Sequence, residues 1–492
     1  MVKFQYGMLL LGLIVGLLIG YTTLPYVGPA TTTITVTEYR GTPVPTITVT
    51  TTATMTVTTP VASPAPYKPP EKIRAAWIYV GPVEDFGWTY MHDVGRRVVA
   101  NLLKDWLETT YIESVSKEKT AAAVDQLVKL GYNVIFTTSF DHMDPTYDKA
   151  QENPNVMFFH CSGYRRAPNM GTYFADLYQV YYLNGLMAGA LTKTGKIGYI
   201  AAITIPEVIR HINAFAIGAM ETGRLLNKNV TVYVVEIGEW YNPDKARSAA
   251  QTLVDMGVDV LAFTEDSTAT VEFAETMVKR GKEIYVFSHY SPMYEYGPNS
   301  VVSGQLVRWE VIYLDILTKI RAGIYTPSNL ENVDYWYLLN TGAAELGAHV
   351  YPNGTIMYIN PKFEGILKSI IVIDSITGES VTVYDLVMRR YHLMKEAPLL
   401  QPLQNTALTH IYESIVKVPI GTSHIEAQIV SAIFDPFTGP LTGYCIADYG
   451  SRFCSGKSVG TLVRVADGER LTHGDLWTMD WFIRGVVYQG KM

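Results

Sequence analysis

The chain repeats one helix–glycine–strand pattern. Residues 121–138 read AAAVDQLVKLGYNVIFTT, and residues 249–264 read AAQTLVDMGVDVLAFT. In each copy an amphipathic helix ends at a glycine, Gly131 or Gly257, and a buried strand follows. The repeat predicts an α/β chain with two similar lobes. Two lobes that face each other form a cleft, and a cleft that closes about a hinge is suited to holding a small molecule.

From about residue 73 onward, strands alternate with helices. This alternation predicts two doubly wound parallel-sheet lobes joined by a hinge. We place lobe 1 at 73–192, lobe 2 at 193–305 and a crossover back to lobe 1 at 306–360. We interpret residues 361–427 as an insertion and residues 428–492 as a C-terminal segment.

The N-terminal region predicts a location at a membrane. Lys3 precedes an apolar run that reaches Leu24. This run favours an uncleaved membrane anchor over residues 1–24, with a cleaved signal peptide as the alternative. Residues 25–72 are rich in Thr, Val and Pro, which is typical of an extended stalk. We therefore expect a folded region tethered to the extracellular face of the cell membrane.

Composition limits the classes of partner. Nearly half of the 492 residues are hydrophobic (48%), and the net charge is −7 without a basic cluster, which argues against nucleic acid. The spacing of His, Cys, Asp and Glu matches no metal site, so we expect neither metal nor cofactor. Cys445 and Cys454 flank a short turn and can pair outside the cell, whereas Cys161 ends an apolar strand and is expected to be a buried thiol.

Ligands of doubly wound sheets bind beyond the carboxyl ends of the strands. The residues that follow five predicted strands are therefore candidates for a binding site. These are Asp85, Phe86, Gly87, Trp88, Thr89, Ser139, Phe140, Glu239, Trp240, Glu265, Asp266, Ser288 and His289. Aromatic and acidic side chains in both lobes suit a flat heteroaromatic ligand, which stacks on rings and donates to carboxylates. Alternatively, Asp85 caps the next helix, Glu265 and Asp266 form an N-cap pair, and each Trp is a packing residue.

Several segments resemble one family. GPVEDFGWTYMHDVGRR, NVIFTTSFDHMDP, GYRRAPNMGTYF, IPEVIRHINAFAIGA and WYNPDKARSAAQTLVDMGVDVLAFTEDS are similar to segments of the basic membrane protein family. The resemblance resumes near the C-terminus at IFDPFTGPLTGY and LWTMDWFIRGV. It implies a type I periplasmic-binding-protein-like fold. It also implies a solute-binding protein of an ABC importer, with a purine nucleoside or a purine base as ligand.

The resemblance also implies roles for particular residues. Asp85, Trp88 and Thr89 match an acid, a stacking aromatic and a polar neighbour in nucleoside-binding relatives, and Trp240 matches a second stacking aromatic. Relatives carry an acid for the ribose hydroxyls where this chain has Ser288, His289 and Tyr290. The ligand is then a free base, or a nucleoside held in a different way. We predict that eight residues bind the ligand: Asp85, Trp88, Thr89, Ser139, Phe140, Trp240, Asp266 and His289.

The resulting hypothesis is a tethered receptor that captures its solute by lobe closure. Its expected partners are the small-molecule ligand, an ABC permease with its ATPase, and the membrane. Two alternatives remain: a nucleoside-processing enzyme, for which the sequence shows no phosphate-binding loop or metal cluster, and a sensor ectodomain without a transport role. We expect no catalytic residues.

Overall fold

The computed structural model describes residues 67–396 and 434–492. The described residues belong to one compact unit. The predicted anchor, most of the predicted stalk and residues 397–427 of the predicted insertion therefore lie outside the described part of the chain. Among the helices of the described part, none combines the length and the apolar character that crossing a membrane requires.

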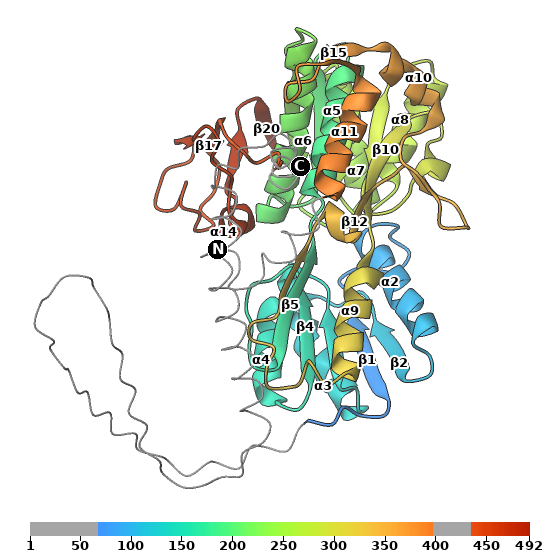
Figure 1. The fold of residues 1–492 in the computed structure, drawn as a ribbon, viewed down its shortest axis with the longest axis vertical. Coiled ribbons are helices and arrows are strands. Elements are labelled where there is room, and N and C mark those ends of the chain that lie inside the picture. The colour runs from blue at the N-terminus through green and yellow to red at the C-terminus, as the bar shows by residue number, and fades with distance from the viewer. Residues whose placement is uncertain (1–66, 397–433) are drawn as a thin grey trace, which may run out of the picture. The chain divides into compact units, whose positions relative to one another are not determined.

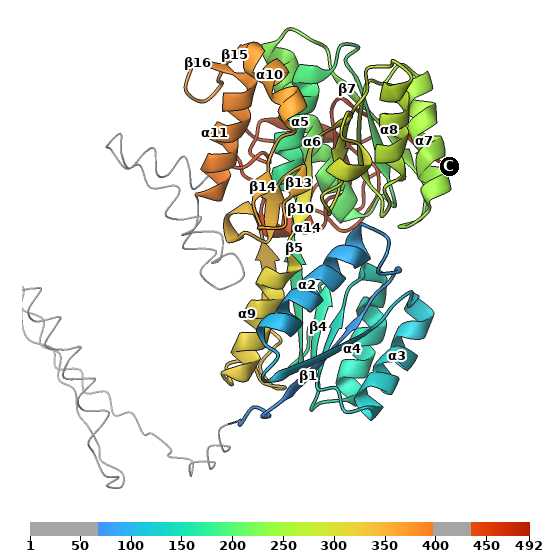
Figure 2. The same ribbon diagram turned by 90° about the vertical axis from the view of Figure 1, so that its right-hand side faces the viewer.

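Lobe 1 is built on a sheet of six parallel strands, in the order β11-β5-β4-β3-β1-β2. Figures 1 and 2 show its strands β1, β4 and β5. Its strands and helices alternate along the chain as the sequence predicts. Its elements are β1 (Ile73–Ile78), α2 (Trp88–Leu102), β2 (Leu107–Ile112), α3 (Lys117–Lys129), β3 (Val134–Thr137), the 3-10 turn η1 (Phe140–His142), α4 (Met143–Glu152), β4 (Met157–Cys161), β5 (Met170–Ala175), α9 (Trp309–Arg321) and β11 (Asp334–Tyr337).

Lobe 2 is built on a seven-stranded sheet in the order β12-β10-β9-β8-β6-β7-β20, in which only β12 runs antiparallel to its neighbour. Its elements are α5 (Tyr178–Leu191), β6 (Lys196–Ala201), α6 (Pro206–Leu225), β7 (Thr231–Glu236), α7 (Pro243–Asp255), β8 (Val260–Thr264), α8 (Ala269–Lys279), β9 (Tyr285–Ser288), η2 (Tyr294–Tyr296), β10 (Val301–Val307), η3 (Leu339–Thr341), β12 (Ala344–Leu346) and β20 (Val486–Lys491). The doubly wound architecture with parallel sheets is confirmed.

The two copies of the repeat fold alike. In one, α3 ends at Lys129, two residues before Gly131, and β3 follows; in the other, α7 ends at Asp255, two residues before Gly257, and β8 follows. Both glycines have a left-handed φ, 84° and 87°. In both copies the glycine N–H and the next N–H donate to carbonyls of the last helical turn, at 2.9–3.2 Å. Such a turn favours glycine because a Cβ makes left-handed φ unfavourable.

The boundary between the lobes differs from the prediction. The helix α5 lies in lobe 2, although we assigned residues 73–192 to lobe 1, because it packs against α6, β9 and β10. Gly185, Gly189 and Gly218 allow α5 and α6 to approach closely, since a Cβ at each would come within 2.1–2.2 Å of a carbonyl oxygen of the other helix. The chain therefore enters lobe 2 directly after β5, near Asp176.

Three chain segments join the lobes, after β5, after β10 and after β11. They are hydrogen-bonded to one another: Asp176 N donates to Tyr337 O at 2.8 Å, and Arg308 N donates to Ala343 O at 2.7 Å. The helix α9 then packs on α2 of lobe 1, in line with the predicted return of the chain. Three adjacent crossings are a suitable hinge, because a few terminal residues absorb the rotation.

The described part of the predicted insertion covers lobe 2. Its α11 packs on α5, which is why α5 is buried on all sides (Figure 1). A buried Arg390 on α11 pairs with Asp374 at 2.6 Å and with Glu221 of α6 at 3.5 Å. Its elements are α10 (Pro361–Ser369), β15 (Ile371–Ile373), β16 (Ser380–Thr382) and α11 (Val383–Lys395). The short strands β13 (His349–Val350) and β14 (Ile356–Met357) precede it, within the predicted crossover.

The C-terminal residues form a small module, which we define as residues 434–485. A three-stranded antiparallel sheet holds it together, and the Cys445–Cys454 disulfide that the sequence left open is present. Cys161 is a buried free thiol, as predicted. After the module, β20 joins the sheet of lobe 2 beside β7. The elements of the module are β17 (Leu441–Cys445), β18 (Leu462–Val465), α14 (His473–Trp477) and β19 (Trp481–Ile483).

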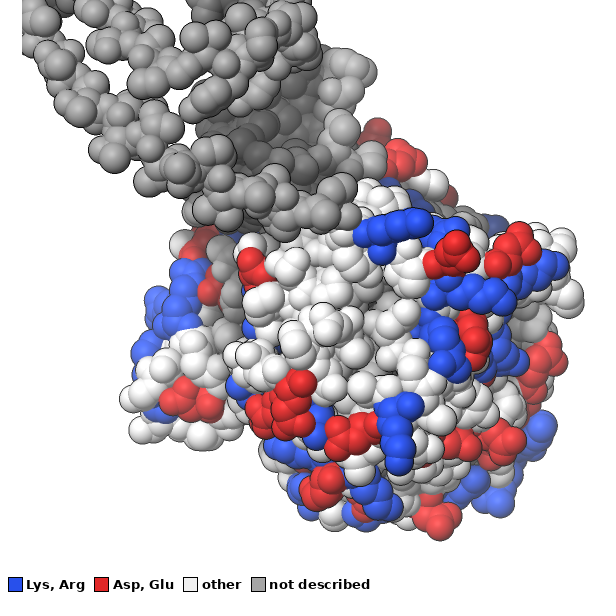
Figure 3. All heavy atoms as spheres, turned by 90° about the horizontal axis from the view of Figure 1, so that it is seen from below, with Lys and Arg blue, Asp and Glu red and all other residues white. Residues whose placement is uncertain are grey.

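Charged side chains of both signs are interspersed on the face that Figure 3 shows. Lys and Arg lie next to Asp and Glu there, so this face presents no large area of one sign. Nucleic-acid binding typically uses a clustered basic surface, and this face lacks one.

Candidate functional site

A cavity lies between the two lobes, at the carboxyl ends of their strands. About 310 Å³ of space free of protein atoms lies among its lining residues, part of it open to solvent. Four of its side chains are aromatic and two are acidic. The lining residues are Val80, Trp88, Ser139, Phe140 and Ser162 from lobe 1, and Ile205, Glu207, Trp240, Asp266 and Tyr290 from lobe 2.

Five of the eight predicted ligand-binding residues are thus brought together: Trp88, Ser139, Phe140, Trp240 and Asp266. Trp88 begins α2 and is held firmly, with its indole N–H donating to Thr138 O at 2.5 Å. Its ring makes edge contacts with Trp309 and with Tyr290 of lobe 2, at centroid distances of 5.3 and 5.2 Å. Trp240, at the end of β7, is half-buried. Aromatic rings from both lobes therefore face one space.

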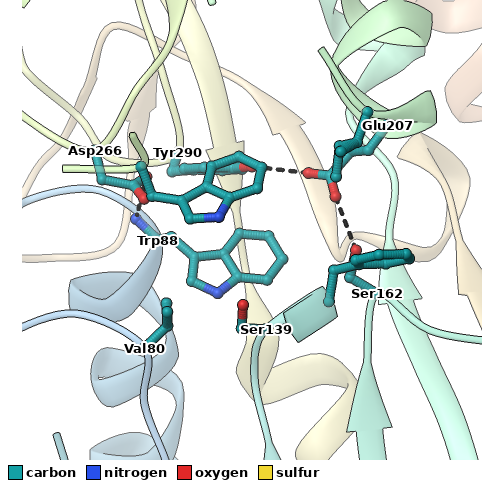
Figure 4. Close-up of a pocket in the computed structure, with 10 residues that line it drawn as sticks. Val80, Trp88, Ser139, Ser162, Glu207, Asp266 and Tyr290 are labelled. Carbon is teal, nitrogen blue, oxygen red and sulfur yellow. Dashed lines mark hydrogen bonds between the residues drawn. The ribbon is translucent and has the colours of Figure 1, made fainter. Parts of the chain in front are cut away.

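Two carboxylates of lobe 2 point into the same cavity (Figure 4). Glu207, in the first turn of α6, accepts from Tyr290 Oη at 3.0 Å and from Ser162 Oγ at 2.9 Å. Asp266, which follows β8, accepts from the backbone N–H of Trp88 at 3.1 Å. No Lys or Arg lies among the residues that line this cavity. The cavity therefore suits a neutral or cationic ligand with hydrogen-bond donors.

The lobes are in contact around the cavity. Trp88–Asp266 and Ser162–Glu207 are hydrogen bonds from lobe 1 to lobe 2. A third bond runs from the Ser291 hydroxyl to the carbonyl of Phe86. These contacts describe a closed arrangement, because each joins strand-end loops of opposite lobes.

Asp85 and Thr89 are buried but do not line the cavity. Asp85 accepts from the backbone N–H groups of Gly87, Thr89 and Tyr90 at 2.8–3.0 Å, which is the helix-cap alternative from the sequence. The Thr89 hydroxyl accepts from Gly81 N at 3.2 Å. Both side chains fix the loop that presents Trp88.

His289 lies behind the cavity wall. Its ring is fully buried, lies within 2.6 Å of Tyr181 Oη through Nδ1, and packs against Tyr290. Burial lowers the pKa of His289 well below the ordinary value for histidine. In this arrangement the ring supports Tyr290, which itself faces the cavity.

Sequence reasoning missed five lining residues: Val80, Ser162, Ile205, Glu207 and Tyr290. A signal for most of them was present. Ser162 directly follows β4, and Ile205 and Glu207 follow β6 after a short loop. The strand-end rule finds these residues when it is applied to every strand, because both sheets end at the same cleft.

Asp85 and Asp266 lie near the N-terminus of α2, and both are buried. Burial raises the pKa of Asp85 to about 6, against the effect of its backbone hydrogen bonds. Burial, together with the negative charge of Asp85, raises the pKa of Asp266 well above its usual range. A carboxyl group that keeps its proton can both donate and accept a hydrogen bond. Asp266 can therefore match a ligand edge with a donor beside an acceptor.

Within residues 67–396 and 434–492, no cluster of three or more His, Cys, Asp or Glu side chains has the geometry of a metal site. The side chains that line the cavity offer hydrogen-bond partners and aromatic surfaces.

Comparison with known proteins finds relatives that are about one-third identical in sequence. A purine-binding protein of Brucella abortus (strain 2308) is 33% identical over 300 residues, which are 61% of this chain and 82% of that protein. A putative ABC transporter glucose-binding protein of Haloferax volcanii is 34% identical over 276 residues, which are 56% of this chain and 67% of that protein. These two relatives are named for different ligands, so the identity of the ligand does not follow from similarity.

A solved structure shares the fold. The structure of an ABC transporter solute-binding protein from Aeropyrum pernix K1 superposes with a TM-score of 0.51 at 16% identity. The superposition covers 73% of this chain and 99% of the Aeropyrum pernix chain. The type I periplasmic-binding-protein-like architecture expected from the sequence is confirmed.

The family model for PnrA-like substrate-binding proteins of ABC transporters matches residues 72–350, more than half of the chain and the whole region that lines the cavity from the two lobes. The protein therefore belongs to this family, the basic membrane protein family, and is a solute-binding protein of the ABC-transporter type.

Proposed function

We propose that the protein captures a purine nucleoside or a purine base between its lobes and delivers it to an ABC permease. The cavity between the lobes carries this proposal. It combines aromatic side chains from both lobes with two carboxyl groups, and it contains neither Lys nor Arg among its lining residues.

A purine fits this combination for two reasons. Its flat ring has two faces that can stack on Trp88 and Trp240, and a good aromatic contact contributes about 1 kcal/mol. Its edge alternates nitrogen acceptors with N–H donors, which Asp266 and Glu207 can pair. A phosphorylated ligand does not fit, because the Glu207 carboxylate would face its charge and no Lys or Arg is among the residues that line the cavity.

Closure is the proposed mechanism. The cross-lobe bonds of Trp88, Ser162 and Ser291 form only when the lobes meet, so a ligand that fills the cavity favours the closed form. We propose that the permease recognises this closed form. We further propose that the N-terminal region tethers the receptor to the extracellular face of the membrane.

Isothermal titration calorimetry tests the ligand. The full chain, purified in a mild detergent, is titrated with adenine, guanine, adenosine, guanosine, inosine and glucose. We expect submillimolar binding of at least one purine and no binding of glucose. Binding of glucose without binding of any purine would overturn the purine assignment and favour the sugar named for the Haloferax volcanii relative.

Trp240→Ala tests the site. Trp240 is half-buried at the end of β7, so its loss should weaken purine binding by about tenfold with little effect on folding. Tyr241→Ala is the matched control, because Tyr241 is the exposed neighbour and is not a lining residue. Unchanged affinity in Trp240→Ala would remove the cavity as the purine site.

A further inference from the structure

The hairpin of β13 and β14 carries the sequence Asn-Gly-Thr in its turn. The two strands pair antiparallel, and residues 353–355 lie between them. Asn-x-Thr, with any residue but Pro in the middle, is the acceptor sequence for N-glycosylation. The chain carries the same pattern at residues 229–231, as Asn-Val-Thr. The two copies have different structural surroundings, which distinguish them as acceptors.

The copy at Asn353 is accessible. Residues 351–355 are all exposed. Gly354 N donates to Tyr351 O at 2.8 Å, and Tyr351 N donates to Thr355 O at 2.9 Å, so backbone bonds close the turn without covering it. No atom of the described residues lies within 4 Å of the position that a Cβ of Gly354 would take. An enzyme can therefore reach all three residues of this copy.

The side chain of Asn353 is held in place by the turn. Its Oδ1 accepts from the backbone N–H of Thr355 at 3.0 Å. This bond folds the amide toward Thr355, the other residue that the acceptor sequence requires. It uses the amide oxygen and leaves Nδ2, the atom to which a glycan is joined, outside the bond. The turn therefore presents the reacting nitrogen on the surface.

The copy at Asn229 is instead built into the sheet of lobe 2. Thr231 is the first residue of β7, and its N–H donates to Gly195 O at 2.9 Å. Val230, between the two, is 6% exposed. A Cβ at Gly195 would come 2.3 Å from Asn229 O, so the backbone is closely packed there. Because β7 pairs with β6 and with β20, binding of these three residues by an enzyme requires opening of the sheet.

We propose that Asn353 is an N-glycosylation site and that Asn229 is not. The co-reactant is an oligosaccharide carried on a lipid phosphate. Nδ2 of Asn353 forms a bond to the anomeric carbon of the first sugar, and the bond from that carbon to the phosphate oxygen breaks. The lipid phosphate leaves with the electron pair of that bond, and Nδ2 releases one proton.

This inference rests on the extracellular location in the proposed function. The Cys445–Cys454 disulfide supports that location, because disulfides persist in oxidising surroundings. The glycan covers apolar surface of the hairpin, where Val350 and Tyr351 are 38% and 44% exposed. No residue from 350 to 355 lines the cavity between the lobes, so the glycan does not compete with the ligand.

Mass spectrometry of the full chain, purified from the cells that naturally produce it, tests the site. We expect the peptide that contains Asn353 to carry the added mass of an oligosaccharide. The peptide that contains Asn229 should have its unmodified mass and serves as the internal control. An unmodified Asn353 would overturn the inference, and a glycan on Asn229 would overturn the distinction between the two copies.

Thr355→Ala and Thr355→Ser form a matched pair of variants. Both keep the backbone bonds that Thr355 makes with Tyr351 and Asn353, so the hairpin should fold in each. Produced in the same cells, Thr355→Ala should lose the added mass, whereas Thr355→Ser retains an acceptor sequence and should keep it. Purine affinity should differ by less than about twofold between the two variants. An added mass that persists in Thr355→Ala would contradict modification at Asn353.

Labelling of intact cells separates the two possible failures. An amine-reactive label that does not cross membranes should modify the protein on whole cells. A protein that is labelled but lacks a glycan at Asn353 would overturn this inference alone. A protein that the label does not reach would overturn the extracellular location, and this inference with it.

Discussion

The two lobes share one helix–glycine–strand unit but differ in the chemistry at the ends of their strands. In lobe 1, β3 is followed by Ser139 and Phe140; in lobe 2, the equivalent β8 is followed by Glu265 and Asp266. Among the residues that line the cavity, lobe 1 contributes no acid and lobe 2 contributes both, so we call these two sides the neutral rim and the acidic rim. A repeated backbone thus places residues at equivalent positions, while the residues themselves decide what each rim binds.

The rims also differ in how firmly they are held. Trp88 of lobe 1 is 7% exposed and packs against His92 and Trp309, so it belongs to the core as well as to the cavity. Trp240 of lobe 2 is half-buried. We therefore regard the lobe 1 wall as rigid and the lobe 2 wall as the more adaptable surface.

Replacing the two tryptophans tests this difference and should give the largest effects. Trp88→Ala should lower the free energy of unfolding by about 3–5 kcal/mol, because it leaves a cavity among packed rings. Trp240→Ala should lower it by less than about 1 kcal/mol. Urea denaturation followed by circular dichroism measures both. Comparable losses in the two variants would contradict the distinction between a core wall and a surface wall.

Glu265, the neighbour of Asp266 in the acidic rim, should make stability depend on pH. It is fully buried, and burial raises its pKa from 4.5 to about 8 in the folded state. The folded state then holds a proton that the unfolded chain releases, so this contribution is present below about pH 4.5 and is lost as pH rises to about 8. At about 1.4 kcal/mol for each tenfold change in proton affinity, the loss amounts to a few kcal/mol.

Glu265→Gln should remove that dependence, because the amide keeps partners for Ser267 and Thr270 without titrating. The measurement is the free energy of unfolding at pH 5 and pH 8 in both proteins. The exposed Glu331→Gln is the control and should leave the pH dependence unchanged. An equally steep fall in stability in Glu265→Gln would assign the titration to another group.

Asp85 and Asp266 meet at the N-terminus of α2 from opposite lobes, and their roles should separate. Asp85→Ala removes the acceptor of three backbone N–H groups and should cost about 1–2 kcal/mol of stability with ligand affinity unchanged. Asp266→Ala should instead weaken ligand binding, because it removes a cavity carboxyl group and a cross-lobe bond. Thermal unfolding and calorimetry distinguish the two. A loss of affinity in Asp85→Ala would return Asp85 to the ligand contacts that the sequence predicts.

The fold was predictable where the pattern was local. The repeat around Gly131 and Gly257 identified two parallel sheets, and the strand-end rule then placed Trp88, Phe140 and Trp240 at one cleft. The rule works because the carboxyl ends of parallel strands lie at the same edge of a sheet, independently of how the rest of the chain folds.

Other features depend on contacts between distant segments. The helix α5 follows β5 in the chain, so we assigned it to lobe 1, but its surroundings are α6 and α11 of lobe 2. Apolar residues on all sides of α5 indicate that the helix is buried, but they do not indicate which sheet it packs against. The position of Trp477, whose ring centroid lies 5.5 Å from that of Phe174 in β5, likewise depends on how the C-terminal module docks, which short strands and a five-residue helix do not encode locally.

The smallest effects should come from the two glycines that the sequence identified first. Both have a left-handed φ, so Gly131→Ala and Gly257→Ala should each cost about 1 kcal/mol in the free energy of unfolding. The cost should be greater at Gly131. A Cβ there comes 2.9 Å from the guanidinium of Arg74, which donates to Leu130 O, whereas a Cβ at Gly257 finds no atom closer than 3.7 Å.

A double-mutant cycle isolates that difference. In an Arg74→Ala background the neighbour of Gly131 is gone, so the costs of the two glycine substitutions should become equal within about 0.3 kcal/mol. Urea denaturation of the single and double variants supplies the comparison. A difference that persists without Arg74 would show that the two copies of the repeat differ in their backbones, and that the likeness of the lobes ends at the helix cap. Equal costs would show instead that the copies share one backbone and differ only in the side chains around it.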